Sequence, residues 1–247
     1  MPPIVRHATR ALFGGCVCLG LAAGAAAQTC EVSSGARPPA VVELYTSEGC
    51  SSCPPADRWL STLKHQDGVL ALSFHVNYWN HLGWRDPFAT TETTARQYRL
   101  KEALGGKYVY TPQVVLNGRD HRAWPGQTSS HLAPLPSLGA PALRLRREGN
   151  EVTAQFTASA AHAQLAGYWA VLQDGIVSKV TRGENAGEAL RHDHVVSLYQ
   201  PVEPWAGKAG HSTRLTLPAE RTARVAFVVT TPDLTRPLQA LVLQCPS

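Results

Sequence analysis

The chain has 247 residues with a formal net charge of +5, and 17% of its residues are charged. This length is enough for one large domain or two small ones with a proper apolar core. Lysine and arginine do not gather into a stripe with interleaved aromatic residues, so the composition gives no support to nucleic-acid binding.

The N-terminal segment is typical of an export signal. Arg6 and Arg10 provide positive charge, an apolar run follows, and three alanines at residues 25–27 form a cleavage pattern. The run is too short for a permanent membrane span, and no later apolar run is long enough for one. We therefore expect residues 1–27 to be a signal peptide, the mature chain to begin at Gln28, and the protein to be periplasmic or secreted without a transmembrane segment.

Four cysteines remain in the mature chain, and their positions divide them into two pairs. Cys30 and Cys245 lie near the two ends, whereas Cys50 and Cys53 form a CxxC motif. In an oxidising compartment the two terminal cysteines are expected to pair as a structural disulfide. Two unpaired thiols, or a bond to a partner protein, are the alternatives. A zinc site made of all four cysteines is least favoured because of the terminal positions, and we assign no metal ligands.

Strand and helix signals alternate in the first half of the mature chain. The apolar run at residues 40–45 predicts a strand, and Pro54 and Pro55 are placed where the first turn of a helix tolerates proline. Apolar residues at helical spacing continue to Lys64, and the near-continuous apolar run at residues 69–76 predicts a buried strand. Strand, helix and strand together predict a parallel βαβ unit.

The remaining elements divide at a predicted domain boundary. A helix is expected over residues 91–104, followed by a strand at 114–116 that Asn117-Gly118 closes as a hairpin turn. Prolines and a glycine between residues 134 and 141 mark a seam. Beyond it, alternating apolar residues predict an antiparallel sheet or sandwich. The expected strands there are 152–158, 168–172, 195–198, 224–230 and 238–243. We therefore predict two domains, residues 28–138 and a β-rich part at residues 139–247.

The CxxC motif has the position of a redox dithiol. It follows a strand and begins a helix, where free backbone N–H groups and the helix dipole favour an anion. This position favours the thiolate form of Cys50, which can attack disulfides, while Cys53 would resolve the mixed disulfide. The dithiol itself carries the electrons, so no cofactor is implied.

Three further residues are predicted to support this dithiol. A proline directly before a strand suggests a cis Thr111–Pro112 bond that presents the Thr111 backbone to an extended substrate, the alternative being an ordinary trans proline. Glu43 interrupts an apolar strand. In thioredoxin-like proteins, which this arrangement of strand, CxxC and Thr-Pro resembles, a buried acid in the corresponding strand can accept the proton of the resolving cysteine, so the resemblance implies this role for Glu43 toward Cys53. The alternative for Glu43 is a place on a solvated strand face.

Other polar and aromatic residues allow two interpretations each. The loop aromatics are expected to pack onto the core more than to form a substrate platform; they are Tyr78, Trp79, Trp84 and Phe88. His75 and His81 are interpreted as ordinary histidines rather than metal ligands. The turn-like segment 182–187 is either a plain hairpin loop or a cover over the redox pair.

Several segments together are similar to a known family. They are Glu43–Asp57, His75–Trp79, Leu82–Phe88, Tyr110–Gln113 and Arg182–Asn185. The order of strand, CxxC, βαβ unit and Thr-Pro resembles the thioredoxin superfamily, and the segments resemble the secreted bacterial proteins grouped as DUF1223. This resemblance implies an α/β, thioredoxin-like fold with an appended β-rich C-terminal part, an antiparallel sheet or sandwich.

These patterns predict an exported thiol–disulfide oxidoreductase in which Cys50 and Cys53 are catalytic. Its expected partners are protein or peptide thiols and disulfides, with a membrane redox protein as a further candidate. Two alternatives stay open, so enzyme activity itself is not fixed. One is a copper(I) carrier using the same cysteines, which the absence of methionine from the mature chain disfavours. The other is a binding module in which the CxxC is a purely structural disulfide.

Overall fold

The computed structural model describes residues 29–137, 139–218 and 224–245, and the predicted signal peptide lies outside the described residues. Within them the chain forms two α-helices and fourteen strands. The helices are α1 (Pro54–Ser61) and α2 (Thr91–Ala103). The first strands are β1 (Thr29–Ser33), β2 (Ala40–Thr46), β3 (Val69–His75), β4 (Gln113–Leu116), β5 (Arg119–Asp120), β6 (Leu143–Glu148) and β7 (Glu151–Phe156). The later strands are β8 (Gln164–Gln173), β9 (Ile176–Lys179), β10 (Ala189–His192), β11 (Val195–Ala206), β12 (His211–Thr216), β13 (Arg224–Thr230) and β14 (Pro237–Leu243).

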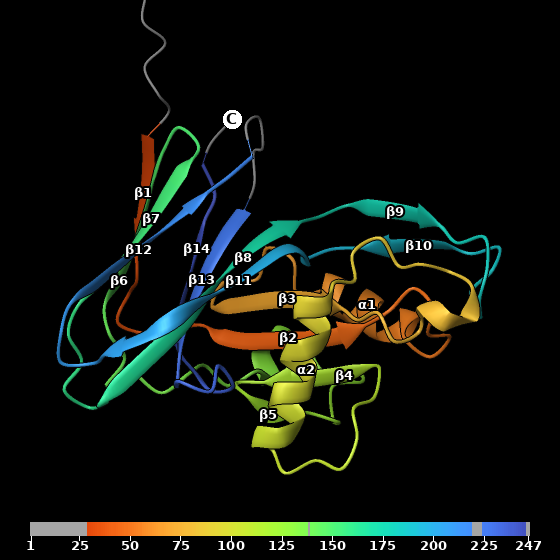
Figure 1. The fold of residues 1–247 in the computed structure, drawn as a ribbon, viewed down its shortest axis with the longest axis horizontal. Helices are drawn as coiled ribbons and strands as arrows, with labels where there is room; N and C mark the ends of the chain where they lie inside the picture. Colours follow the sequence, from red (N-terminus) through yellow and green to blue (C-terminus); the bar gives the residue numbers. More distant parts are fainter. Residues whose placement is uncertain (1–28, 138, 219–223, 246–247) are drawn as a thin grey trace, which may run out of the picture.

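Eight strands form the main sheet, in the order β14-β13-β8-β11-β3-β2-β4-β5 (Figure 1). The expected parallel unit is present at its centre, where α1 connects β2 to β3. Val42 and Leu44 of β2 face α1 and pack with Leu60. Val41 and Tyr45 alternate with them and face the opposite core, which includes Leu100 of α2.

The predicted α/β, thioredoxin-like fold with an appended β-rich part is wrong, because the chain is mostly β and its strands form several sheets. The physical reason is the pairing of β11 with β3. These strands run parallel, with Val195 opposite Ser73, so strands from the second half extend the sheet begun by the first. The division at residues 138 and 139 stays a prediction, and any two such units would share this sheet.

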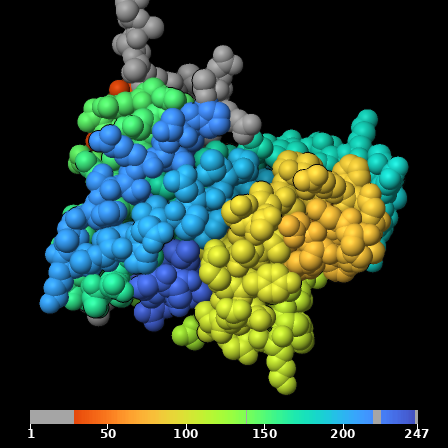
Figure 2. Space-filling view, in the orientation of Figure 1, coloured from red at the N-terminus to blue at the C-terminus, as the bar shows by residue number. Residues whose placement is uncertain are grey.

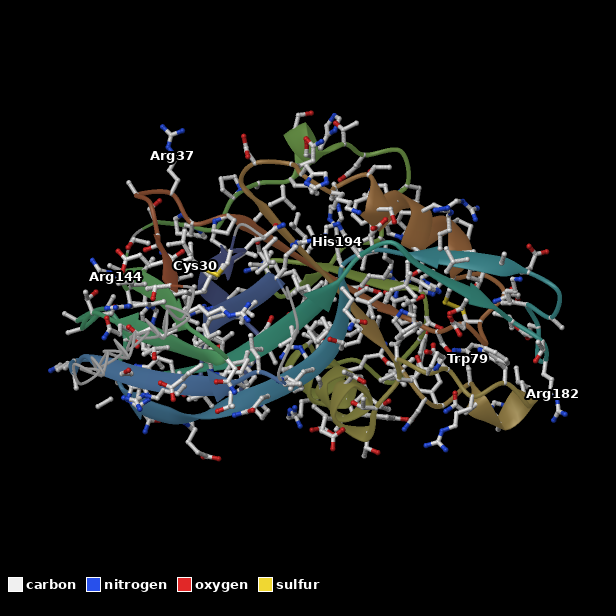
Figure 3. All side chains as sticks on the ribbon, turned by 90° about the horizontal axis from the view of Figure 1, so that it is seen from above. Cys30, Arg37, Trp79, Arg144, Arg182 and His194 are labelled. Atoms are coloured by element: carbon white, nitrogen blue, oxygen red, sulfur yellow. A yellow bond between two sulfur atoms is a disulfide. The ribbon has the colours of Figure 1, made fainter. Side chains whose placement is uncertain are left out.

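A second sheet, in the order β1-β6-β7-β12, packs against one end of the main sheet. Alternating residues of β7 and β13, such as Val152 and Phe227, meet in the apolar core between the two sheets. Cys30 on β1 and Cys245 after β14 form a disulfide. Figure 3 places Cys30 at one end of the molecule, and Trp79 and Arg182 at the other end.

The predicted hairpin turn at Asn117-Gly118 is confirmed. Both residues have positive φ, 52° and 80°, and they connect β4 to β5. Glycine is required at position 118 for a second reason, since an added Cβ would lie 2.4 Å from the carbonyl oxygen of Thr235. No helix in the described ranges is both long and apolar enough to cross a membrane.

Candidate functional site

The CxxC pair forms a disulfide at the first turn of α1. The Sγ atoms of Cys50 and Cys53 are bonded, and the backbone N–H of Cys53 donates to the carbonyl of Cys50 at 3.1 Å. Cys53 is the N-cap of α1, and the first two helical residues are Pro54 and Pro55. Because proline has no N–H, these positions offer no backbone donor to a thiolate. The hydroxyl of Ser52 lies 3.4 Å from Cys50 Sγ and can donate to that sulfur.

Both cysteines of this disulfide are fully buried, with 0% of each residue exposed. A hairpin made of β9 and β10 provides part of the cover, and its connecting segment includes residues 182–187 (Figure 1). In Figure 2 this teal hairpin lies over the same end of the molecule as the orange and yellow residues of the first half. The structure therefore supports the interpretation that residues 182–187 cover the redox pair, and this segment is called the cover below.

Asn185 and Glu184 fasten the cover to the CxxC turn. The Asn185 side chain is buried, and its Nδ2 donates to the carbonyls of Glu48 at 2.9 Å and Cys50 at 3.0 Å. The exposed carboxylate of Glu184 accepts a hydrogen bond from the backbone N–H of Ser51 at 2.9 Å. That bond holds the pKa of Glu184 below its ordinary value. These contacts hold the segment against the CxxC turn, beside the buried sulfurs.

Thr111 and Pro112 reach this region through Trp79. The Thr111–Pro112 peptide bond is cis. The indole Nε1 of Trp79 donates to Thr111 Oγ1 at 2.8 Å. On its other side Trp79 approaches the CxxC turn so closely that a Cβ on Gly49 would lie 2.9 Å from Trp79 Cβ. One side chain thus contacts both predicted parts of the site, and the proposed substrate pairing at Thr111 stays a prediction.

The structure does not bring Glu43 to the cysteines. Glu43 lies on the face of β2 opposite to α1 and is buried, with 2% exposed. Its carboxylate pairs with the guanidinium of Arg96 and accepts a hydrogen bond from Tyr168 Oη at 2.7 Å. Tyr45 Oη donates to its second oxygen at 3.2 Å. Glu43 therefore belongs to a buried polar network of the core, on the far side of the sheet from Cys53.

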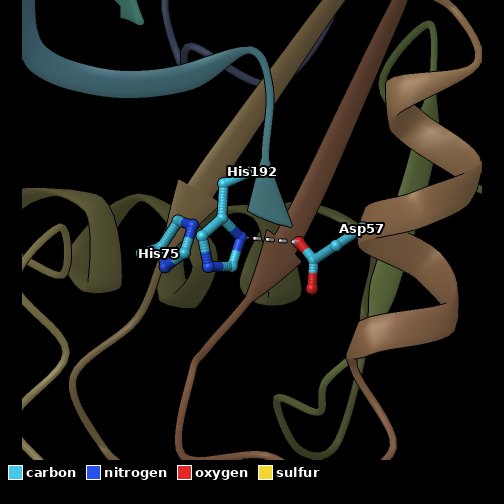
Figure 4. A group of neighbouring side chains, drawn as sticks. All are labelled: Asp57, His75 and His192. Atoms are coloured by element: carbon cyan, nitrogen blue, oxygen red, sulfur yellow. Dashed lines mark ion pairs between the residues drawn. The ribbon is translucent and has the colours of Figure 1, made fainter. Parts of the chain in front are cut away.

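A different group of ionisable residues lies on the α1 side of the sheet. Asp57 comes from the first turn of α1, His75 from the end of β3 and His192 from the end of β10 (Figure 4). One ligand atom from each of the three lies within 4.8 Å of the others. Their exposed fractions are only 7%, 0% and 2%. His192 reaches this position because the pairing of β11 with β3 brings the adjoining end of β10 to the end of β3.

Each histidine of this group is oriented by a further carboxylate. His75 Nδ1 lies 2.7 Å from Asp86 Oδ2, and His192 Nε2 lies 3.1 Å from Glu48 Oε1. The carboxylates are themselves held, since the backbone N–H of Glu48 donates to Asp86 at 2.8 Å. The other ring nitrogens, His75 Nε2 and His192 Nδ1, are buried and have no hydrogen-bond partner in the described structure.

The three carboxyl groups differ in how well their charge is compensated. Burial alone would raise the pKa of Asp86, but His75 and backbone N–H donors hold it below its ordinary value. Burial likewise opposes ionisation of Glu48, yet its hydrogen bond from His192 lowers its pKa. For Asp57 burial dominates, so its pKa is raised although the two histidines and Thr46 oppose this. Asp57 is thus the least compensated of the three carboxyl groups, and its ion pair with His192 Nδ1 is the longest, at 4.0 Å.

The pKa of His75 shifts in the direction opposite to that of its partner Asp86. Burial alone would lower the pKa of His75, but the charge of the adjacent Asp86 outweighs this effect, and the pKa is raised.

Phe88 packs edge-on against the His75 ring, with centroids 5.2 Å apart. Trp84 donates from Nε1 to Glu48 Oε2 at 2.7 Å. Phe88 and Trp84 therefore line this buried group, whereas Tyr78 and Trp79 pack against the core on the other face of the sheet. His81 is exposed, and its Nδ1 donates to the carbonyl of Tyr78 at 2.7 Å.

Four residues of this group were not predicted as site residues from the sequence: Glu48, Asp57, Asp86 and His192. One signal was present for Asp57, because it follows Cys53 by four residues and so lies on the same face of the helix. The sequence around His192 gave no such signal. Its position depends on the pairing of β11 with β3, two strands that lie more than a hundred residues apart in the chain.

Together these features define a mostly β protein with a covered CxxC disulfide and a buried histidine–carboxylate group beside it. The chain belongs to the DUF1223 family, "Protein of unknown function (DUF1223)", whose model matches residues 41–231. The resemblance to the DUF1223 family that the sequence indicated is therefore confirmed.

Two solved structures are similar to this chain. Protein AGR_C_4864 from Agrobacterium tumefaciens is 31% identical, with a TM-score of 0.64 over 83% of this chain and 93% of that chain. HBP35 of Porphyromonas gingivalis is 14% identical, with a TM-score of 0.57 over 85% of this chain and 76% of that chain, which is a likeness of fold alone. No protein of curated function matches the sequence significantly.

Proposed function

We propose that this protein exchanges thiols and disulfides with protein or peptide substrates in the periplasm or outside the cell. The observation that supports this most is the place of the Cys50–Cys53 disulfide at the first turn of α1, with the Ser52 hydroxyl beside the Cys50 sulfur. A hydrogen bond from that hydroxyl favours the thiolate, which is the attacking and leaving form in disulfide exchange.

The proposed reaction transfers two electrons. Starting from the reduced protein, the Cys50 thiolate attacks one sulfur of a substrate disulfide, whose S–S bond breaks and releases one substrate thiolate. The Cys53 thiolate then attacks Cys50 Sγ, which breaks the mixed disulfide and releases the second substrate thiolate. The substrate is reduced, the Cys50–Cys53 bond forms, and the two protons of the dithiol end on the substrate thiols. The reverse sequence oxidises a substrate dithiol.

Burial of both cysteines makes the cover part of this proposal. A protein disulfide cannot reach Cys50 while Asn185 and Glu184 hold the segment 182–187 in place. Exchange therefore takes place in a conformation with the cover displaced. The same burial also favours the alternative of a purely structural disulfide, so the experiment must separate the two.

A trapping experiment with a chromogenic aromatic disulfide tests the proposed roles. We expect Cys53→Ser to react through Cys50 and to accumulate a stable mixed disulfide, because the resolving thiol is missing. The matched variant Cys50→Ser is expected to react at least tenfold more slowly, because the Ser52 hydroxyl that favours a thiolate lies beside the Cys50 sulfur. Equal rates for the two variants, or no adduct in either without denaturant, would favour the structural disulfide.

A further inference from the structure

We propose that Asp57, His75 and His192 form a binding site for a divalent transition-metal ion. This inference does not depend on the exchange chemistry proposed for the cysteines. Its basis is that one ligand atom from each residue lies within 4.8 Å of the others, in a buried group assembled from α1, β3 and β10 (Figure 4).

The two histidines are prepared as ligands by their other ring nitrogens. Asp86 holds Nδ1 of His75 and Glu48 holds Nε2 of His192, at 2.7 and 3.1 Å. A carboxylate on the far nitrogen fixes the orientation of a metal-binding imidazole and increases its basicity. The second nitrogen of each ring is then left for the metal.

Those second nitrogens are unsatisfied without a ligand. His75 Nε2 and His192 Nδ1 are fully enclosed and accept or donate no hydrogen bond within the described residues. A buried polar atom without a partner destabilises the folded protein by about 1–3 kcal/mol, so an ion that both nitrogens coordinate would remove this cost. His192 Nδ1 lies 4.0 Å from Asp57 Oδ1, which is too far for a hydrogen bond.

The charge of the group also favours a cation. Three buried carboxyl groups surround two imidazoles, and their ion pairs in the described part of the chain are with these histidines only. Within the residues that the structure describes, Asp57 receives a single hydrogen bond, from Thr46 Oγ1 to its Oδ2 at 2.9 Å. A divalent ion would supply the missing positive charge, and Thr46 would orient Asp57 from behind.

Two imidazole nitrogens and one carboxylate oxygen suit a borderline ion such as zinc(II). Ligands of tetrahedral zinc, each about 2.0–2.1 Å from the ion, are roughly 3.3 Å apart. The 4.0 Å between His192 Nδ1 and Asp57 Oδ1 would therefore shorten by less than an ångström on binding. Three protein ligands leave a fourth position open for water or another small ligand.

A cavity adjoins the group. It has a volume of about 410 Å³ and is lined by both Asp57 and His192. Ser51 and Pro54, from the CxxC segment, and Asn185, from the cover, contribute to the same cavity. This cavity therefore adjoins both the CxxC segment and two of the three proposed ligands.

Calorimetric titration with zinc(II) tests the site directly, on the full chain purified without a histidine tag and with both disulfides oxidised. We expect one ion per chain. Asp57→Asn, which keeps the side-chain shape and an acceptor for Thr46, should weaken binding by more than about a hundredfold, since even second-shell changes cost 10- to 100-fold. His194→Asn is the matched control, because His194 is also buried with both ring nitrogens unpartnered but lies outside this group.

Cobalt(II) spectra of the same oxidised protein distinguish the site from the cysteines. Nitrogen and oxygen ligation without a thiolate charge-transfer band is expected, both in the wild type and in Cys50→Ser/Cys53→Ser. If Asp57→Asn fails to fold, His75→Gln replaces it and must also lose binding. Absence of zinc and cobalt binding by the oxidised protein, binding that survives Asp57→Asn, or binding that disappears with the cysteines would overturn the proposal.

Discussion

Replacing Arg96 by methionine is expected to lower the free energy of unfolding by about 3–5 kcal/mol. The guanidinium of Arg96 is buried and is the cationic partner of Glu43, and it also donates to the carbonyl oxygen of Leu234 at 2.9 Å. Its centre lies 4.3 Å from the ring centroid of Tyr168. Without Arg96, the Glu43 carboxylate remains buried and uncompensated. Urea denaturation with disulfides intact measures the loss.

The double variant Glu43→Gln/Arg96→Met provides the control. It removes both charges, so it should lose less stability than Arg96→Met alone, because a buried unpaired charge costs more than a neutral pair. The single variant Glu43→Gln should leave the rate of exchange per folded molecule unchanged, since Glu43 lies on the face of β2 away from α1. A loss below 1 kcal/mol in Arg96→Met would contradict this account of the network.

Asn185→Ala is expected to accelerate reduction of the Cys50–Cys53 disulfide by dithiothreitol about thirtyfold. The substitution removes two hydrogen bonds, from Nδ2 to the carbonyls of Glu48 and Cys50. At about 1 kcal/mol each, these bonds favour the closed cover by roughly 2 kcal/mol, and 1.4 kcal/mol corresponds to a factor of ten. The rate is followed by alkylation of the two freed thiols, in the presence of a chelator.

Arg182→Ala is the matched control for this experiment. Arg182 lies in the same segment, but its side chain is exposed and points away from the molecule (Figure 3). Its substitution should change the rate less than twofold, whereas Asn185→Asp, which loses the donor but keeps the shape, should resemble Asn185→Ala. An Asn185→Ala rate equal to wild type would show that reduction does not depend on opening the cover.

Local patterns in the sequence were sufficient to predict the central strands and helices. The apolar run at 69–76 corresponds to β3, the helix expected over 91–104 to α2, and the alternation at 152–158 to β7. Each of these elements depends on residues within one short segment, so the spacing of its apolar residues is enough to predict it. The disulfide partners were also correct, because four cysteines in two distinct settings leave few pairings.

The fold class and the site depended on contacts between distant segments. Nothing in the sequence near Val195 or Ser73 indicates that β11 pairs with β3. That pairing joins the strands of the two halves of the chain into one sheet and places His192 beside His75 and Asp57. Glu43 failed as a site residue for a related reason. Alternation shows that Glu43 and Leu44 face opposite sides of the sheet, but only the structure shows which side α1 covers.

The reduction potential of the Cys50–Cys53 pair tests the central claim most directly. The protein is equilibrated in glutathione buffers at pH 7, and its free thiols are then alkylated. The reduced fraction is measured on the peptide that carries Cys50 and Cys53, so that Cys30 and Cys245 do not contribute. We predict a potential between about −300 and −120 mV, the range of proteins that exchange disulfides and of the compartments that hold them. A pair that stays oxidised below about −300 mV would be a structural disulfide, and the proposed exchange would be wrong.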